Sequence, residues 1–457
     1  MRLTLDVAKN VEDFSFSSIP NDVKDRAKLL ILDNLGCTIA GSRTESAGKM
    51  LSYLRRVAAD GVSKVWGTPF SFDSANAAHA NAHFASVLSL DDSYIQFGHP
   101  GSSIIPAAVA VAAEIGSTGE QLLTAIIGGY EMSLRLGSAL RPSTERDARV
   151  QGYATWQIYG ACTASCILHR LETEQVADAY GIVATHAQLP FLRKFHSQPM
   201  CELKNNYGWA NKAAIVSVDL ARAGFNGNRT IFDGEDGFWM MAGSDRFDPD
   251  KMLARWQDRY FVREVGFKPF AVCRWIHTTI DCVRSLMSEY GITHRDVKLV
   301  RVETANEFVE EFTGEWPTTT TEAAFHIPYA VSLELHEKTS ANGLSSGSLS
   351  DQAIHETGKR VQVEALSGGD EKFRRQRVLP AQVTMFLSDG RTVSRYSELP
   401  SGAPDGPPYG QADVVDKFLR LSVPILGQRP AESLADDVLS LEAFDSSAMQ
   451  RSFLAHS

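Results

Sequence analysis

Helical periodicity across the first half of the chain is the feature that most restricts the fold. From Pro20 to about Arg222, apolar residues recur at the 3.6-residue spacing of helices. The clearest segments are Val23–Ile39, Ser74–Leu88, Ile105–Ile115 and Glu120–Leu136. The small residues from Pro106 to Ala113 predict a buried helix, because short side chains let helices approach closely. This half of the chain is therefore predicted to be all-helical.

Two-residue periodicity replaces this pattern in the second half. Apolar and polar residues alternate, as in half-buried strands, in three segments: Lys298–Glu303, Val361–Glu364 and Ala381–Leu387. Asp389 and Gly390 follow the last segment and predict a hairpin. Two helices are also expected. Arg274–Tyr290 precedes the first strand, and Thr321–Leu335 lies between the first and second strands. This mixture predicts a smaller α+β domain.

A segment rich in Pro and Gly, Ser401–Gly410, is the clearest linker in the chain. Helical spacing returns after it, at Ala412–Leu421 and Ala431–Leu441. A chain of 457 residues exceeds what one hydrophobic core usually supports. We therefore predict a mainly α fold, in which residues 1–262 and 404–457 form a large all-helical domain and residues 263–403 form an inserted α+β lid domain.

Charge and composition exclude several classes of partner. The formal net charge of −10 argues against nucleic acid, which needs clustered cations. No run of about 18 apolar residues predicts a membrane span, and Asp6 precedes any apolar stretch that a signal peptide would need. The six cysteines include no CxxC pair and are expected to be reduced thiols. We expect a cytoplasmic protein, and its net charge does not exclude an anionic substrate.

Motifs for cofactors and metals are missing. No GxGxxG follows a predicted strand and no GxxxxGK[ST] occurs, so the backbone cradles for dinucleotides and nucleoside phosphates are absent. His79 and His83 lie one helical turn apart, but the Glu of HExxH and a third ligand are lacking. We expect neither a cofactor nor a metal.

One group of chemically capable residues lies between two apolar helices. Asp91, Asp92, Ser93 and His99 gather in a segment rich in Gly and Pro. Such a loop can present side chains into a cleft while the helices hold it in place. The same residues also suit a structural role, as helix caps or turn residues.

A second group contains Lys268, next to a Pro-marked turn, and His277. If a helix already begins at Lys268, the spacing of nine residues gives both side chains similar azimuths, and they can share a site. The alternative is that Lys268 is a solvated lysine and His277 a satisfied core residue.

Several motifs together resemble the MmgE/PrpD family over nearly the whole chain. In order along the sequence they are Ile19-Pro20 with Leu32–Gly41, Asp91-Asp92-Ser93 with His99–Ser102, Lys204 with Ala210–Ala214, Lys268-Pro269 with Cys273 and His277, and Ala324–Ala330. The family includes 2-methylcitrate dehydratases, cis-aconitate decarboxylases and an iminodisuccinate epimerase. The resemblance implies a homodimer without cofactor, with the site between a helical domain and a lid.

The resemblance also implies which residues form the site. The matched catalytic residues are His99, His277, Lys204, Lys268 and Asp91, and those expected to bind substrate are Asp92, Ser93, Lys268, Lys204 and Tyr153. Lysines would hold carboxylates, and histidines would move the proton. Two positions depart from the family pattern, because Ser89 replaces an acidic residue and Ala154 replaces a histidine.

The frequency of the activities in the family that the chain resembles favours a lyase that acts on a small polycarboxylic acid, by dehydration or decarboxylation through proton abstraction beside a carboxylate. An epimerase of a dicarboxylate such as iminodisuccinate is the close alternative, because the imidazole absent at Ala154 would serve as a second acid in elimination. A carboxylate-binding protein without catalytic activity is the third possibility.

Overall fold

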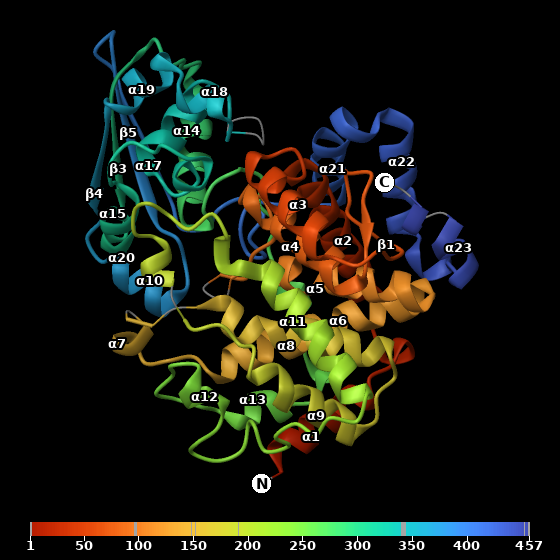
Figure 1. The fold of residues 1–457 in the computed structure, drawn as a ribbon. Coiled ribbons are helices and arrows are strands. Elements are labelled where there is room, and N and C mark those ends of the chain that lie inside the picture. Colours follow the sequence, from red (N-terminus) through yellow and green to blue (C-terminus); the bar gives the residue numbers. More distant parts are fainter. Residues whose placement is uncertain are drawn as a thin grey trace.

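The computed structural model describes residues 2–95, 98–147, 149–150, 152–190, 192–339, 344–451 and 453–455. Within these ranges, only the backbone is described for residues 153, 154, 192, 193, 204, 346 and 455. Helices make up most of the described chain, so the mainly α class is confirmed. Figure 1 shows a large helical part and a smaller part that contains the sheet.

The large part is built from helices that follow one another closely in sequence. They are α1 Leu3–Glu12, α2 Asn21–Gly41, α3 Glu45–Val57, α4 Ser74–Val87, α5 Pro100–Ile115, α6 Gly119–Ala139, α7 Thr144–Asp147, α8 Tyr153–Leu168, α9 Thr173–Ala184, α10 Leu192–Phe195, α11 Tyr207–Arg222, α12 Phe238–Met241 and α13 Pro249–Leu253. The prediction of an all-helical region is wrong in one detail. A short antiparallel pair, β1 Ser63–Lys64 and β2 Ser71–Phe72, closes the turn between α3 and α4.

Small residues let the central helices of this part pack closely, as the sequence predicts. Helices α6 and α8 cross at Gly129 and Gly160. A Cβ atom on either glycine would lie 2.8 Å from the carbonyl oxygen of the other. This crossing therefore brings α8 against α6, and α5 packs on both.

A four-stranded sheet organises the smaller part. Its strands are β3 Val297–Thr304, β4 Val361–Ala365, β5 Ala381–Leu387 and β6 Thr392–Ser397, in the order β4-β3-β5-β6. The β3–β4 pair is parallel and the other two pairs are antiparallel. Gly390, with φ of +91°, makes the tight β5–β6 turn. The helices α14 His277–Tyr290 and α17 Ile327–Leu335 contact this sheet (Figure 1).

The other helices of the smaller part are short: α15 Asn306–Phe312, α16 Thr320–Ala323, α18 Ser346–Leu349, α19 Gln352–Gly358 and α20 Gly369–Glu371. The single helix predicted over Thr321–Leu335 is divided between α16 and α17. The first piece ends at Ala323, and His326 caps the second, because its Nδ1 accepts the Tyr329 N–H at 3.1 Å. Pro328 then occupies the first turn, where no N–H is required.

The chain returns to the large part after the sheet. Helix α21, Gln411–Leu426, packs along α2, and α22, Gln428–Leu439, contacts both. The last helix, α23, spans Ser446–Arg451. Apolar side chains of α21 such as Val414 and Phe418 belong to the same core as those of the N-terminal helices. A second core contains the inner face of the sheet and α14.

Candidate active site

The loop between α4 and α5 is fastened to the start of α5 by two carboxylates. The Gly101 N–H donates to Asp92 Oδ1 at 3.0 Å and Oδ2 at 3.1 Å, and the Tyr130 hydroxyl donates to Oδ2 at 2.7 Å. The Ser102 hydroxyl donates to Asp91 Oδ2 at 2.7 Å. Asp91 and Asp92 are therefore held against the first turn of α5, and Asp92 does act as a cap, from eight residues before Pro100.

His99 immediately precedes α5, and its ring orientation is fixed. Its Nδ1 lies 2.7 Å from the main-chain oxygen of Asp92 and 3.6 Å from Asp91 Oδ1. Because a carbonyl oxygen can only accept, Nδ1 carries the proton, and the neutral ring has its basic lone pair on Nε2. The main-chain N–H of His99 donates to the Tyr207 hydroxyl at 3.3 Å. This arrangement suits a group that takes up a proton at Nε2 while Asp91 stabilises the resulting cation.

Asp92 itself is enclosed rather than presented to a ligand. Burial raises the pKa of its carboxyl to about 8; the charges of Asp91 and Asp33 add to this, and the Tyr130 hydrogen bond opposes it. The carboxyl is therefore mostly protonated at neutral pH. In this structure its oxygens contact Tyr130 and Gly101.

Ser93 joins this loop to the segment that carries Lys268. The Ser93 N–H donates to the Gly266 carbonyl at 2.9 Å, and the Gly266 N–H donates back to the Ser93 carbonyl at 2.8 Å. The Ser93 hydroxyl is buried and has no hydrogen-bond partner among the residues that the structure describes. A buried hydroxyl without a partner is costly, so the Ser93 hydroxyl is available to a water molecule or a polar ligand.

Lys268 and His277 do not share a helix, so the geometric premise for pairing them is wrong. Helical structure begins only at Arg274, as a 3-10 turn, and α14 begins at His277 itself. Pro269 supplies no N–H. The Cys273 N–H donates to the Ala324 carbonyl at 2.7 Å instead of to a helical partner. The backbone from 267 to 273 is therefore extended or turned.

The side chains of Lys268 and His277 are nevertheless close enough to interact electrostatically. Both are fully buried. Burial lowers the pKa of His277 well below its usual range, and the charges of Arg274 and Lys268 lower it further. His277 therefore stays uncharged at neutral pH. Its Nε2 donates to Val272 at 3.2 Å, while Nδ1 is buried without a hydrogen-bond partner in the described chain.

The side chains of Lys204 and Tyr153 lie outside the described residues, so only their backbone positions are known. Lys204 starts a 3-10 turn, Lys204–Asn206, that leads directly into Tyr207, the residue beside His99. Asn205 and Asn206 have φ of +50° and +47°, a left-handed conformation that costs energy in residues other than glycine. Tyr153 is the first residue of α8, which contacts this turn.

A buried ion pair below the loop was not predicted from the sequence. Lys417 Nζ on α21 donates to Asp33 Oδ1 on α2 and to the Leu90 carbonyl, both at 2.6 Å. The charges of Asp91 and Lys268 also act on the pKa of the Asp33 carboxyl. The signal was available, because both residues interrupt apolar helix faces. Lys417 belongs to the stripe formed by Val414, Phe418 and Leu421, and Asp33 follows Leu30-Ile31-Leu32.

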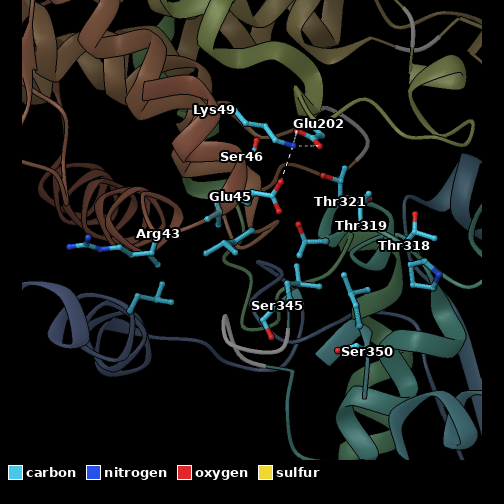
Figure 2. Close-up of a pocket in the computed structure, with 18 of the residues that line it drawn as sticks. Arg43, Glu45, Ser46, Lys49, Glu202, Thr318, Thr319, Thr321, Ser345 and Ser350 are labelled. Atoms are coloured by element: carbon cyan, nitrogen blue, oxygen red, sulfur yellow. Dashed lines mark hydrogen bonds and ion pairs between the residues drawn. The ribbon is translucent and has the colours of Figure 1, made fainter. Parts of the chain in front are cut away.

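A cavity of about 1000 Å³ lies elsewhere, between α3, the segment from Pro317 to Thr321, and α21. Figure 2 shows its lining, which is rich in threonine and serine. Its Lys49 is paired with Glu202 at 2.9 Å and with Glu45 at 3.2 Å. None of the lining residues that the structure describes is a histidine or a predicted site residue. The described lining of the cavity therefore lacks the histidines that are present among Asp91, His99, Lys268 and His277, which we call the cluster around His99.

No group of three or more potential ligands suits a metal in the part of the chain that the structure describes. His79 and His83, considered above as a pair, are buried, and burial lowers the pKa of each to about 4. His83 Nε2 instead lies 2.8 Å from the Ser46 hydroxyl. All six cysteines are thiols.

Among the described helices, none has the length and apolar character required to cross a membrane.

Comparison with known proteins places this geometry in context. The MmgE/PrpD N-terminal domain matches residues 5–249, and the MmgE/PrpD C-terminal domain matches residues 270–442. The chain belongs to the MmgE/PrpD family. Three relatives are named cis-aconitate decarboxylase: those of Aspergillus terreus and Homo sapiens are 23% identical to this chain, and that of Mus musculus is 22% identical. The matches cover 96% of this chain and 93%, 92% and 91% of the relatives, respectively.

The two MmgE/PrpD domains both contribute to the cluster. Asp91 and His99 lie in the N-terminal match, and His277 and Lys417 lie in the C-terminal match. Lys268 lies in the short segment between the matches. The cluster around His99 therefore combines residues from both MmgE/PrpD domains. These residues are distant from one another in sequence.

Proposed function

We propose that this protein is a cofactor-independent lyase that acts on a small polycarboxylic acid. The observation that carries the proposal is His99, whose Nδ1 is fixed by the Asp92 carbonyl at 2.7 Å while the Asp91 carboxylate lies 3.6 Å away. The Ser93–Gly266 backbone pair, which joins this loop to the segment with the buried Lys268, supports the proposal as well. The names of the relatives favour decarboxylation of an unsaturated tricarboxylic acid such as cis-aconitate over dehydration.

Cations would bind the substrate in this proposal. The Lys268 ammonium would pair with one carboxylate and stabilise the negative charge that develops on a neighbouring enolate-like intermediate. Lys204 would hold a second carboxylate, and the Ser93 hydroxyl would donate to the substrate. The unprotonated Nδ1 of His277 would accept a hydrogen bond.

His99 would move the proton. In decarboxylation the bond to the leaving carboxylate breaks, its electron pair moves into the conjugated system, and carbon dioxide leaves. The protonated His99 then delivers a proton from Nε2 to the carbon that has gained electron density. In dehydration the neutral ring would instead remove a proton beside a carboxylate, and Nε2 would pass that proton to the departing hydroxyl, which leaves as water. The substrate's own carboxylates accept electron density, so the proposal needs no cofactor.

The domain division 1–262 with 404–457 and 263–403 is part of the same proposal, with the smaller part acting as a lid. It is supported by the strands β3 to β6, which all lie between residues 297 and 397, and by α21, which packs on α2. His99 is 9% exposed and Lys268 is fully buried, so substrate entry would require movement of the smaller part. We also propose a homodimer, as the family resemblance implies.

Proton NMR in deuterated water tests the reaction directly. The purified chain is incubated separately with cis-aconitate, citrate, methylcitrate and iminodisuccinate. We expect cis-aconitate to lose one carboxylate and the product to carry one deuterium from solvent. Dehydration of citrate or methylcitrate would keep the lyase class and change the reaction. Epimerisation of iminodisuccinate alone, or no conversion of any compound, would overturn the proposal.

A further inference from the structure

A second pocket, separate from the cluster around His99, has basic side chains as half of its lining residues. It has a volume of about 550 Å³, and we call it the arginine pocket. Its charged lining residues are Arg141, Arg246, Asp248, Lys251, Arg374, Arg375 and Arg377. Six are basic and one is acidic, in a chain whose net charge is −10. Such a local reversal of sign attracts anions despite the overall charge.

The arginine pocket lies between the two parts of the molecule. Arg141 follows α6, and Arg246 and Lys251 lie before and within α13. The other arginines follow α20, in and just after the π-helical turn Lys372–Gln376. In Figure 1, α7 and α20 lie near each other at this junction, which an ion pair between Arg374 Nη1 and Asp147 Oδ2 spans at 2.9 Å.

Acidic side chains offset part of the positive charge of the arginine pocket. Arg374 is paired with Asp147 and with Glu307. Lys251 is paired with Asp248 at 3.4 Å, and Arg375 with Glu371 at 3.6 Å. The main-chain oxygen of Arg374 accepts from Arg141 Nη2 at 3.0 Å, which holds the Arg141 guanidinium in place. Burial lowers the pKa of Arg141, and three of the other lining arginines lower it further by repulsion. An anion between these guanidinium groups would relieve that repulsion.

We propose that the arginine pocket is a binding site for a compact anion with at least two negative charges, of the pyrophosphate or tricarboxylate kind. The fork of N–H donors on each guanidinium matches two oxygens of a phosphate or carboxylate group. Lining residues from both sides of the junction can contact different oxygens of one ligand. None of the residues of the candidate active site lines this pocket, so it is a second site and not a part of the first.

Calorimetric titration of the full-length chain tests the proposal. Inorganic pyrophosphate and tricarballylate are the two probes, titrated separately. The double variant Arg246→Gln with Arg375→Gln removes two exposed guanidinium groups that line the pocket. We expect it to weaken binding of at least one probe about tenfold or more, as lost hydrogen bonds between charged groups do. The matched control is Arg56→Gln with Arg429→Gln, which removes two exposed arginines outside the pocket.

Loss of pyrophosphate affinity in the pocket variant alone would identify a phosphate-bearing ligand, and loss of tricarballylate affinity alone would identify a carboxylate. The proposal is overturned if neither probe binds the unmodified chain, if the pocket variant binds as tightly as that chain, or if the control variant is weakened equally. Since the assay measures binding and not turnover, its outcome is independent of whether the chain is a lyase.

Discussion

The Lys417 ammonium and the Asp33 carboxylate form a buried ion pair, with 2.6 Å between Nζ and Oδ1. Burial alone would lower the pKa of Lys417, but the adjacent Asp33 carboxylate more than reverses this and raises it. The ammonium therefore stays charged at neutral pH. It also holds the carbonyl of Leu90, the residue before Asp91. Helices from the two ends of the chain thus support the loop of the candidate site.

Replacement of this lysine should destabilise the fold. In Lys417→Met, Asp33 remains buried without its cation, and we expect the free energy of unfolding in urea to fall by about 3–5 kcal/mol. Arg420→Met, three residues further along α21, removes an exposed ion pair and should cost at most about 1 kcal/mol. An equal fall in the free energy of unfolding in both variants would show that the buried ion pair stabilises the fold no more than the exposed one.

Loss of the His99 imidazole should reduce turnover. We expect His99→Ala to lower kcat on the identified substrate about a hundredfold or more, because it removes the proposed proton carrier. Added imidazole should restore part of the rate, since a small base can occupy the space left by the ring. His294→Ala, in the smaller part, is the control. A His99→Ala enzyme with unchanged kcat would exclude the proposed role.

Lys268 should affect substrate binding more than the rate of the bound complex. We expect Lys268→Ala to raise KM about tenfold or more, because one charge-assisted contact with a carboxylate is lost. The exposed Lys338 offers a control in the same part of the chain. Steady-state kinetics separate the two effects. A fall in kcat with constant KM would instead assign Lys268 to the chemical step.

The raised pKa of Asp92 should appear in the pH dependence of stability. A carboxyl with a folded pKa of about 8 binds its proton more tightly in the folded than in the unfolded chain, whose pKa is near 3.9. Its contribution to stability is thus full at low pH and declines as pH rises from about 4 to 8. Relative to Asp92→Asn, the unmodified chain should lose up to about 1.4 kcal/mol per pH unit in urea unfolding between pH 5 and 8. Parallel curves for the two proteins would contradict this assignment.

Exhaustive dialysis against a chelator should leave turnover unchanged, because the proposed chemistry uses the substrate's carboxylates and protein side chains alone. The comparison is a sample dialysed without chelator, assayed on the same substrate. Activity that disappears and returns only with an added metal ion would show that a metal takes part.

The elements that the sequence predicts best are those whose pattern is local. The alternation in Ala381–Leu387 corresponds to β5 residue for residue, because alternate side chains on this strand are buried. The predicted strands at Lys298 and Val361 are likewise observed. The helix over Thr321–Leu335 is divided because a capping contact by His326 competes with helix continuation, and periodicity does not report such a contact.

The candidate site depends on contacts between distant residues, which local patterns do not reveal. Motif resemblance indicated Asp91, His99 and Lys268. The helix azimuths proposed for Lys268 and His277 do not apply, because no helix connects these two residues. The link between the loop and Lys268 is the Ser93–Gly266 backbone pair, more than 170 positions apart in sequence. Lys417 and Asp33 are 384 positions apart, and only their place on apolar helix faces distinguished them.

The position of Lys417 also has a consequence for biosynthesis. A ribosome translates the loop with Asp91 and His99 more than 300 codons before it reaches the lysine that supports that loop. Until α21 emerges and packs on α2, Asp33 has no Lys417 to neutralise it in the apolar interior. The order of translation therefore delays completion of the candidate site until nearly all of the chain has left the ribosome, so a nascent or prematurely terminated polypeptide would lack a fully supported loop.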